Sequence, residues 1–345
     1  MALGISGSNG GISKEKAKGV DLIERPLEVS YFINNSCNLK CVHCYVGYEE
    51  KQNDLSIDEW IETFDELIGM GALTFGNVGK EPLLEVDKTL ALLDYFARKR
   101  QENSNLRFGL VTNGTLLTEE IIKELERIMP DYVDVSVDGI KETHERIRGK
   151  NTFDKTYNNL RSLPKSLAEK VFISYTLMNT NKDVFPELIN EFENTNINKF
   201  LISPYVSSPQ ENTGLEIKNE EVVQFYKTII NGDKIDFSKH KTLEILLKSD
   251  YDAQKPLIEA LVKNKIIDVN NLLVDKYGVL FNEYKKENGS RIFVNFMPFS
   301  DTLSRAIRIS HDGYVSGCLE MFHKDYKQRT IGNVKIEKIR NLINY

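Results

Sequence analysis

The chain has 345 residues, of which 41% are hydrophobic and 28% are charged, and its net charge at pH 7 is −6. This composition is that of a globular protein of one or two domains, and the intermixed charges argue against a nucleic-acid partner. The sequence has no apolar run long enough to cross a bilayer and no signal peptide, so we expect no membrane partner and a cytoplasmic location.

Predicted elements alternate between strand and helix along most of the chain. Residues 1–26 are rich in Gly, Ser and Lys, and we expect them to form a flexible tail. The helix predicted at 56–70 has Ser56 as its N-cap and Trp60, Phe64 and Leu67 at helical spacing. The remaining helices are predicted at 86–98, 119–128, 157–163 and 184–193. The strands are predicted at 27–33, 72–78, 106–112, 132–136, 171–178 and 199–204.

This alternation predicts an α/β fold, in which a parallel sheet with crossover helices is closed or partly closed as a barrel over residues 27–212. Active sites of such barrels lie at the carboxyl ends of the strands. Residues 213–290 are predicted to be mostly helical and to cover the barrel mouth. Strand character returns in 291–345, at 291–296 and 306–310.

Three of the four cysteines, Cys37, Cys41 and Cys44, lie within eight residues after the first predicted strand. Clustered thiols in a protein without export signals indicate a metal site rather than a disulfide framework. Three thiolates on a four-iron cluster leave one iron without a protein ligand, whereas ferredoxins usually fill all four positions with cysteine. The alternative is structural zinc with His43 as fourth ligand, although His43 adjoins Cys44 and would strain a tetrahedral site.

The Cys-x3-Cys-x2-Cys loop after a first strand resembles that of the radical S-adenosylmethionine (SAM) superfamily. The resemblance implies a partial (β/α)6 TIM-like barrel and one 4Fe–4S cluster held by Cys37, Cys41 and Cys44. It also implies that the amino and carboxylate groups of SAM chelate the open iron. In that family, reductive cleavage of SAM gives methionine and a 5′-deoxyadenosyl radical, which abstracts a hydrogen atom from the substrate.

Two further segments follow predicted strands. Residues 76–83, Gly-Asn-Val-Gly-Lys-Glu-Pro-Leu, resemble the family's Gly-Gly-Glu-Pro segment, which implies that Gly79 and Glu81 contact the SAM amino group. Lys80 departs from the usual glycine, and because the family's contacts there are largely through the backbone, we expect SAM binding to survive. The segment at 112–115, Thr-Asn-Gly-Thr, is also typical of the family and implies that Asn113 lies at the cofactor.

The fourth predicted strand ends in a Ser-x-Asp-Gly segment followed by His144 and Arg148, which resembles a pattern of peptide-modifying members. The resemblance implies that Ser136 meets the SAM ribose and that Arg148 meets its carboxylate, a pairing that a guanidinium can make bidentately. His144 is expected to be a packing residue. His43 stands where an aromatic residue is usual, and is implied to stack on adenine.

Residues 309–318 and 330–334 resemble the start of the auxiliary-cluster domain called SPASM or twitch. Because the cysteines of that domain do not follow, we predict a vestigial hairpin that closes the barrel, and no second cluster. Cys318 has three interpretations. It is a small buried residue, a thiol that gives a hydrogen atom to the substrate radical, as in an epimerase, or a residue that contacts the substrate.

These features favour a radical SAM enzyme of natural-product biosynthesis, with a peptide as the preferred substrate. The alternative is an epimerase, dehydrogenase or related enzyme acting on a sugar, aminocyclitol or nucleoside. A non-enzymatic iron–sulfur sensor is a further alternative. The resemblance implies reduced flavodoxin or ferredoxin as electron donor.

Overall fold

The computed structural model of the protein describes residues 28–44, 54–206, 213–240, 242–249, 251–275, 277, 279–296, 306–316 and 330–343. The predicted N-terminal tail and Cys318 lie outside these residues. Within the described ranges, no helix is both long and apolar enough to cross a membrane.

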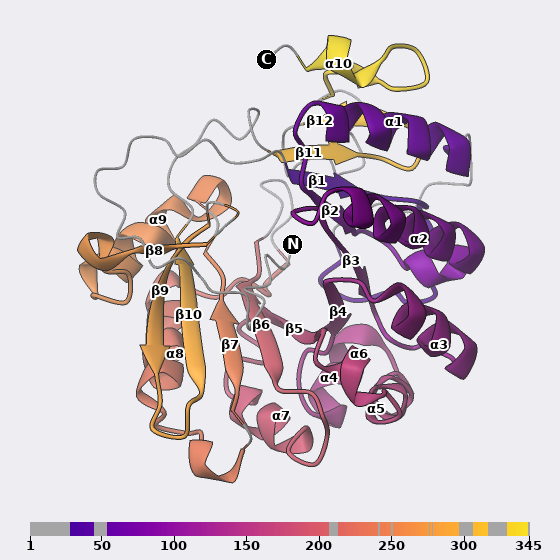
Figure 1. Cartoon of the computed structure of the whole chain (residues 1–345). Helices are drawn as coiled ribbons and strands as arrows, with labels where there is room; N and C mark the ends of the chain where they lie inside the picture. The colour runs from indigo at the N-terminus through magenta and orange to yellow at the C-terminus, as the bar shows by residue number, and fades with distance from the viewer. Residues whose placement is uncertain are drawn as a thin grey trace.

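The described strands form one 13-stranded sheet in the order β13-β12-β11-β1-β2-β3-β4-β5-β6-β7-β10-β9-β8 (Figure 1). From β11 to β10 neighbouring strands are parallel, and the strands beyond both of these are antiparallel. The strands are β1 (Glu28–Tyr31), β2 (Thr74–Asn77), β3 (Arg107–Thr112), β4 (Tyr132–Ser136), β5 (Val171–Leu177), β6 (Lys199–Pro204), β7 (Glu244–Leu247), β8 (Leu273–Val274), β9 (Leu280–Lys285), β10 (Arg291–Phe296), β11 (Ala306–Ile309), β12 (Tyr314–Ser316) and β13 (Gly332–Asn333).

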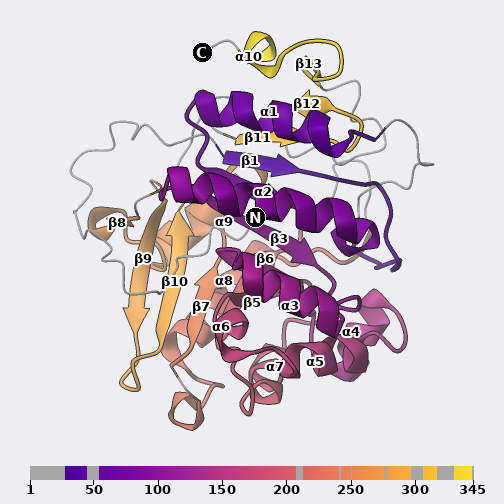
Figure 2. The same ribbon diagram turned by 45° about the vertical axis from the view of Figure 1, so that its right-hand side comes forward.

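Crossover helices connect the parallel strands, and α1, α2 and α3 lie side by side over β1, β2 and β3 in both views (Figures 1 and 2). The α-helices are α1 (Ile57–Gly69), α2 (Val86–Glu102), α3 (Glu119–Ile128), α4 (Lys141–Arg148), α5 (Phe153–Arg161), α6 (Lys165–Ala168), α7 (Phe185–Glu191), α8 (Asn219–Asn231), α9 (Tyr251–Lys263) and α10 (Ile339–Leu342). Short 3-10 turns occur at Pro82–Glu85, Phe237–Lys239 and Val269–Asn271.

Local sequence explains how the first helix begins and what it packs against. Ser56 accepts a hydrogen bond from the Glu59 amide at 3.2 Å, and the Glu59 carboxylate accepts one from the Ser56 amide at 2.8 Å. This reciprocal capping box satisfies amides that the first helical turn leaves unpaired. Trp60 and Phe64 then pack on Tyr31 of β1, with ring centroids 5.5 and 4.9 Å away. The helix thereby covers the outer face of the sheet.

Side chains of the opposite, inner face form a second cluster. Its six members come from β4, β5, β6, β7, β9 and β10, and are Tyr132, Phe172, Leu201, Leu246, Phe281 and Phe293. Register explains the grouping, because Leu201 pairs with Leu246, and Leu246 pairs with Phe293. Side chains alternate between the faces of a strand, so residues two positions away from these also face inward.

The α/β class and the parallel sheet with crossover helices are confirmed, and the predicted bounds of α3, β4 and β6 match those of the structure. Helix α4 was not predicted.

The hairpin of β11 and β12 exists, but the prediction that it closes the barrel is wrong for the described residues. β11 pairs with β1, and the sheet ends at β13 on this side and at β8 on the other. The hairpin therefore extends the sheet beyond β1.

The segment 213–290 is less helical than expected. It contains α8 and α9, and also β7, β8 and β9. A short apolar run such as Glu244–Leu247 has no decisive period, and its pairing with β6 and β10 makes it a strand. The proposed boundary at residue 290 falls in the turn between β9 and β10, two strands paired along six residues. The residues on either side of this boundary therefore belong to one pair of antiparallel strands.

Candidate functional site

The predicted site residues follow the carboxyl ends of β1, β2, β3 and β4. Because these four strands are parallel neighbours, their carboxyl ends meet at one edge of the sheet. The loops at this edge are joined by hydrogen bonds between groups that are far apart in the sequence.

The cysteine loop follows β1. Cys37 and Cys41 are partly buried, and Cys44 is exposed. The Cys44 amide donates to the Cys41 carbonyl at 3.1 Å, and the Leu39 amide points to the Cys37 sulfur at 3.4 Å. Burial raises the pKa of Cys41 to about 11, while the positive charge of Arg148 acts to lower it. The loop thus carries three free thiols beside a cation.

The loop after β2 is fixed to the cysteine loop. The Glu81 amide donates to the carbonyl of Ser36, the residue before Cys37, at 3.0 Å, and the Asn34 side-chain amide donates to the Glu81 carbonyl at 3.0 Å. Gly79 has φ +106°, and a Cβ there would lie 1.9 Å from the Phe32 ring. Glycine is therefore required for this close approach.

Lys80 lies in the same loop and is only 7% exposed. Burial lowers the pKa of its ammonium, and the thiols of Cys44, Cys37 and Cys41 act to raise it. The residue that departs from the usual glycine thus puts a positive charge beside the three cysteines.

The Glu81 carboxylate joins the loops after β2 and β3. It is 1% exposed and accepts hydrogen bonds from the Leu83 amide at 3.0 Å, the Thr112 hydroxyl at 2.8 Å and the Asn113 amide at 2.8 Å. Burial raises the pKa of Glu81, and these hydrogen bonds act to lower it. In the described structure the side chain therefore binds protein groups, and its predicted contact with the SAM amino group stays a prediction.

Asn113 joins the loop after β3 to the cysteine loop. Its side-chain amide donates to Asn38, between Cys37 and Cys41, at 2.8 Å. The side-chain amide of Asn38 donates in return to the Thr115 hydroxyl at 2.9 Å. The backbone amide of Thr115 donates to the side-chain oxygen of Asn113 at 2.9 Å. Three polar side chains thereby hold the cysteine loop over β3.

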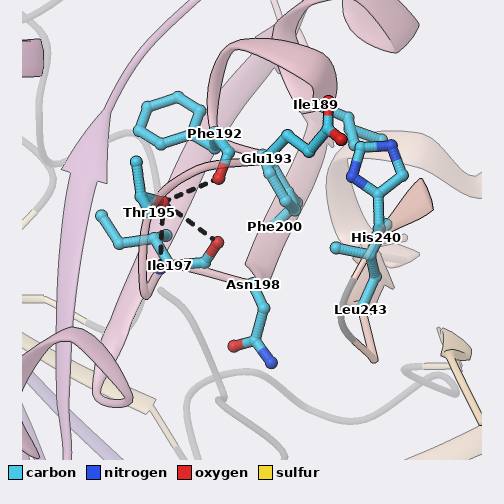
Figure 3. Close-up of a pocket in the computed structure, with 9 residues that line it drawn as sticks. All are labelled: Ile189, Phe192, Glu193, Thr195, Ile197, Asn198, Phe200, His240 and Leu243. Carbon is cyan, nitrogen blue, oxygen red and sulfur yellow. Dashed lines mark hydrogen bonds between the residues drawn. The ribbon is translucent and has the colours of Figure 1, made fainter. Parts of the chain in front are cut away.

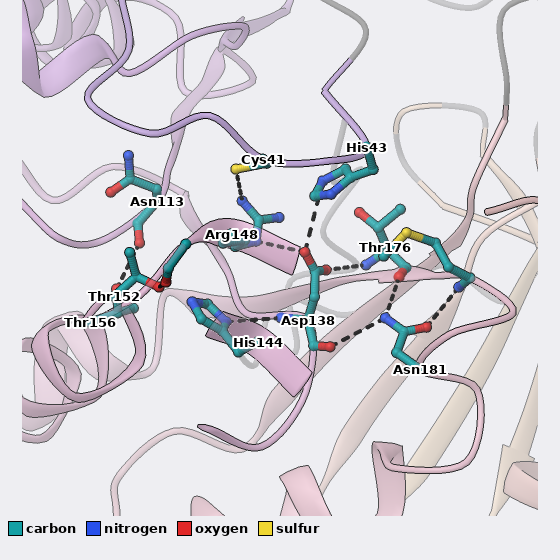
Figure 4. A network of polar contacts seen from close by, with 12 residues as sticks. Cys41, His43, Asn113, Asp138, His144, Arg148, Thr152, Thr156, Thr176 and Asn181 are labelled. Atoms are coloured by element: carbon teal, nitrogen blue, oxygen red, sulfur yellow. Dashed lines mark hydrogen bonds and ion pairs between the residues drawn. The ribbon is translucent and has the colours of Figure 1, made fainter. Parts of the chain in front are cut away.

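Asp138, after β4, is the centre of a buried polar network (Figure 4). One carboxylate oxygen lies 2.6 Å from Arg148 Nε, and the other accepts from the Thr176 amide at 2.8 Å. Burial acts to raise the pKa of Asp138, but the charges of Arg148 and His43 hold it below its usual value. The Asp138 carbonyl accepts from Asn181 at 3.2 Å. The sequence pattern contained this aspartate, yet no function was predicted for it.

Arg148 links this network to the cysteine loop. Its Nη1 lies 3.9 Å from the Cys41 sulfur (Figure 4). The amide of Val42 donates to the carbonyl of Ile147 at 2.9 Å. The guanidinium is 7% exposed and is paired with Asp138. The geometry puts Arg148 beside a cysteine, and its predicted pairing with the SAM carboxylate stays a prediction.

The two histidines of the site lie on either side of Asp138 (Figure 4). His43 Nε2 is 3.8 Å from the Asp138 carboxylate, and burial lowers the pKa of His43 to about 4. His144 accepts from the Asp138 amide at 3.3 Å and packs edge-on against Phe153, consistent with the expected packing residue. Ser136 is the last residue of β4, is partly buried, and lies on the inner face.

The donor set fits an iron–sulfur cluster. Three thiols lie on one loop, and Lys80 and Arg148 supply positive charge beside them. In the described part of the chain, no three His, Cys, Asp or Glu side chains are gathered closely enough to hold a single metal ion. The thiolates of a four-iron cluster bind separate irons and need not meet that spacing.

A pocket lies elsewhere in the fold (Figure 3). Its lining includes Thr195, Ile197 and His240, which precede β6 and β7. Because these residues lie at the amino ends of the strands, the pocket is not part of the site formed by the cysteine loop.

Comparison with known proteins agrees with this arrangement. Residues 31–204 match the family model of the radical SAM superfamily. The chain is 33% identical over 172 residues to an Fe-coproporphyrin III synthase of Methanosarcina barkeri, a match that covers 49% of this chain and 41% of that protein. It is 30% identical over 142 residues to the antilisterial bacteriocin subtilosin biosynthesis protein AlbA of Bacillus subtilis, covering 40% of this chain and 30% of that protein.

Among solved structures, SuiB of Streptococcus suis bound to the precursor peptide SuiA aligns with a TM-score of 0.64 and 15% identity. The alignment covers 93% of this chain and 65% of that chain. At this identity the likeness shows the fold. The chain spans less than half the length of the two relatives above.

Proposed function

The chain belongs to the radical SAM superfamily, and on that premise we propose that it is an enzyme that reductively cleaves SAM at a single 4Fe–4S cluster. Cys37, Cys41 and Cys44 would hold the cluster, and Gly79, Glu81, Asn113, Ser136, Arg148 and His43 would form the surroundings of SAM. The observation that carries the proposal is the attachment of the cysteine loop to the loops after β2 and β3 and to α4. When bound, the cluster supplies the electron that converts SAM to methionine and the 5′-deoxyadenosyl radical.

The residues of the chain contribute chiefly by fixing positions. Glu81 and Asn113 hold their loops through buried hydrogen bonds, and the Asp138–Arg148 pair holds Cys41 against α4. Side chains locked in this way keep a site close to its working geometry before any ligand arrives. Lys80 and Arg148 supply two positive charges next to the thiolates, which favours the deprotonated state that metal ligation needs.

We infer that the substrate is a peptide in natural-product biosynthesis. Support comes from AlbA, which is named for bacteriocin biosynthesis, and from SuiB, which is solved with a precursor peptide. The second candidate is a small molecule, for which the Fe-coproporphyrin III synthase relative is the specific support. A reduced flavodoxin or ferredoxin is the proposed electron donor, and a cytoplasmic location would keep the three thiols reduced.

The test is anaerobic reconstitution followed by addition of dithionite and SAM, with iron per chain and 5′-deoxyadenosine as the two measurements. We expect about four irons per chain and formation of deoxyadenosine. Cys41→Ala should lose both, while the matched variant Cys318→Ala should keep its iron because the fourth cysteine is not a proposed ligand. A cluster that forms without SAM cleavage would instead support the sensor alternative, and zinc in place of iron would contradict the proposal.

A further inference from the structure

Arg107, the first residue of β3, carries a buried charge that the proposed reaction does not use. The residue is 2% exposed, and its Nε, Nη1 and Nη2 have no hydrogen-bond partner. Burying an unpaired charge is costly, and buried guanidinium groups are normally paired with a carboxylate or several acceptors. The group therefore has the properties of a binding site for an anion.

Two aromatic rings lie next to this guanidinium. Its central carbon is 5.2 Å from the ring centroid of Tyr132 and 5.5 Å from that of Tyr277. Aromatic faces attract a cation, but they do not accept the directed hydrogen bonds that five N–H groups offer. The two rings therefore hold the guanidinium in place and leave its hydrogen-bonding capacity for a ligand.

Register places Arg107 on the inner face of the sheet. Gly109 pairs with Tyr132, a member of the inner-face cluster, and Arg107 is two residues before Gly109 on the same face. A Cβ at Gly109 would lie 2.7 Å from the Tyr132 ring. Glycine thus allows that ring to lie over β3 beside Arg107.

The same face leads to the predicted SAM site. Thr112 of β3 pairs with Val135, so Ser136 is level with the position after Thr112, which is six residues beyond Arg107, or about 20 Å at about 3.3 Å per residue. A ligand that reaches from Ser136 to Arg107 must therefore be extended over roughly that length. Asp134 lies between Tyr132 and Ser136 on the same face, so a negative group on the ligand is favoured at the Arg107 end.

We propose that Arg107 binds a carboxylate of an extended, peptide-like substrate, held between Tyr132 and Tyr277. This inference rests on the proposed function and names the substrate class of that site. A guanidinium can bind a carboxylate through two parallel hydrogen bonds, which gives both affinity and orientation. A compact neutral sugar or a basic aminocyclitol offers no such partner.

The test measures binding of hippurate, which combines an aromatic ring, a peptide bond and a carboxylate, to the cluster-loaded protein by calorimetry. Hippuramide, its neutral counterpart, is the matched ligand. Because a hydrogen-bonded charge pair forms only with the carboxylate, we expect hippurate to bind at least about tenfold more tightly than hippuramide. Arg107→Met should abolish this preference. Arg161→Met, which removes an exposed arginine 5.7 Å from the Tyr157 ring, should retain it.

Thermal unfolding separates binding from a structural role. Replacing an unpaired buried charge by an apolar side chain should leave the melting temperature of Arg107→Met equal to or above that of the wild type. Equal binding of hippurate and hippuramide, a preference that survives in Arg107→Met, or a lower melting temperature would overturn the proposal. Deoxyadenosine formation by the wild type and by Arg161→Met, measured in parallel, tests the proposed function independently of these outcomes.

Discussion

The loops after β1 to β4 use buried polar groups, and the strands β6, β7, β9 and β10 use partly buried charged groups, in different ways. At the loops, a side chain forms a hydrogen bond with a backbone amide or a side-chain amide of another segment. Glu81 binds the Asn113 amide, Asn113 binds Asn38, and Asp138 binds the Thr176 amide. These residues are at most 7% exposed, apart from Asn38 and Thr176. Each bond fixes the position of a loop.

In the second region, charged side chains pair with one another across neighbouring strands. Glu244 lies 2.8 Å from Arg291 and 3.7 Å from Lys199, and Arg291 also lies 3.6 Å from Glu283. All four face inward next to the inner-face cluster, as their register with Leu201, Leu246 and Phe293 requires. These pairs join strands that are already hydrogen-bonded to each other.

Polar groups taken out of solvent therefore have two roles in this fold. Hydrogen bonds between loops hold the cysteine loop in one position, which a metal site requires of its supporting residues. Ion pairs between strands add to the stability of the sheet and leave the site unchanged. Substitutions in the two regions should therefore separate metal binding from stability.

The largest effect is expected from Asp138→Asn. Loss of the carboxylate leaves the buried Arg148 guanidinium uncompensated, which should reduce the free energy of unfolding by about 3–5 kcal/mol. Because Arg148 contacts Cys41, iron per chain should fall as well. Denaturant unfolding and iron analysis measure the two effects.

A double variant separates those two effects. Asp138→Leu combined with Arg148→Met removes both charges, so part of the lost stability should return. Iron content should remain low, because the double variant has no Arg148 guanidinium to contact Cys41. Full recovery of iron in the double variant would show that the pair serves stability alone.

A matched pair of glutamates compares the two regions directly. In Glu81→Gln, one end of the carboxamide must present an NH2 group to a backbone amide or to the Thr112 hydroxyl. We expect a loss of about 1–3 kcal/mol in the free energy of unfolding, together with a lower iron content. Glu244→Gln should cost about 1 kcal/mol or less and leave iron unchanged. Equal iron loss in both variants would contradict the proposed division.

The smallest effect is expected from Lys80→Met, and it concerns the midpoint potential of the bound cluster. A positive charge beside the thiolates stabilises the reduced, more negative form of a cluster. Its removal should make the midpoint potential more negative by on the order of 60 mV, which equals a tenfold change for a one-electron couple. Lys80→Arg, which keeps the charge, is the control for a redox titration of the bound cluster. An unchanged potential in Lys80→Met would show that the charge does not act on the cluster.

Local patterns in the sequence determined the elements of the first half of the fold and the cysteine loop. The capping box at Ser56, the apolar spacing after it and the bounds of α3 depend on neighbours within a few residues. The same holds for the spacing of Cys37, Cys41 and Cys44, which a single loop contains. Such features need no knowledge of distant strands.

The remaining features depend on groups that the fold brings together from distant parts of the chain, so local patterns could not predict them. Pairing with β6 and β10 made Glu244–Leu247 a strand, and pairing with β1 placed the C-terminal hairpin at an end of the sheet. The contact of Asn38 with Asn113 spans 75 residues, and that of Arg148 with Cys41 spans 107. The burial of Arg107 between Tyr132 and Tyr277 is likewise a property of strands and turns that meet only in the fold.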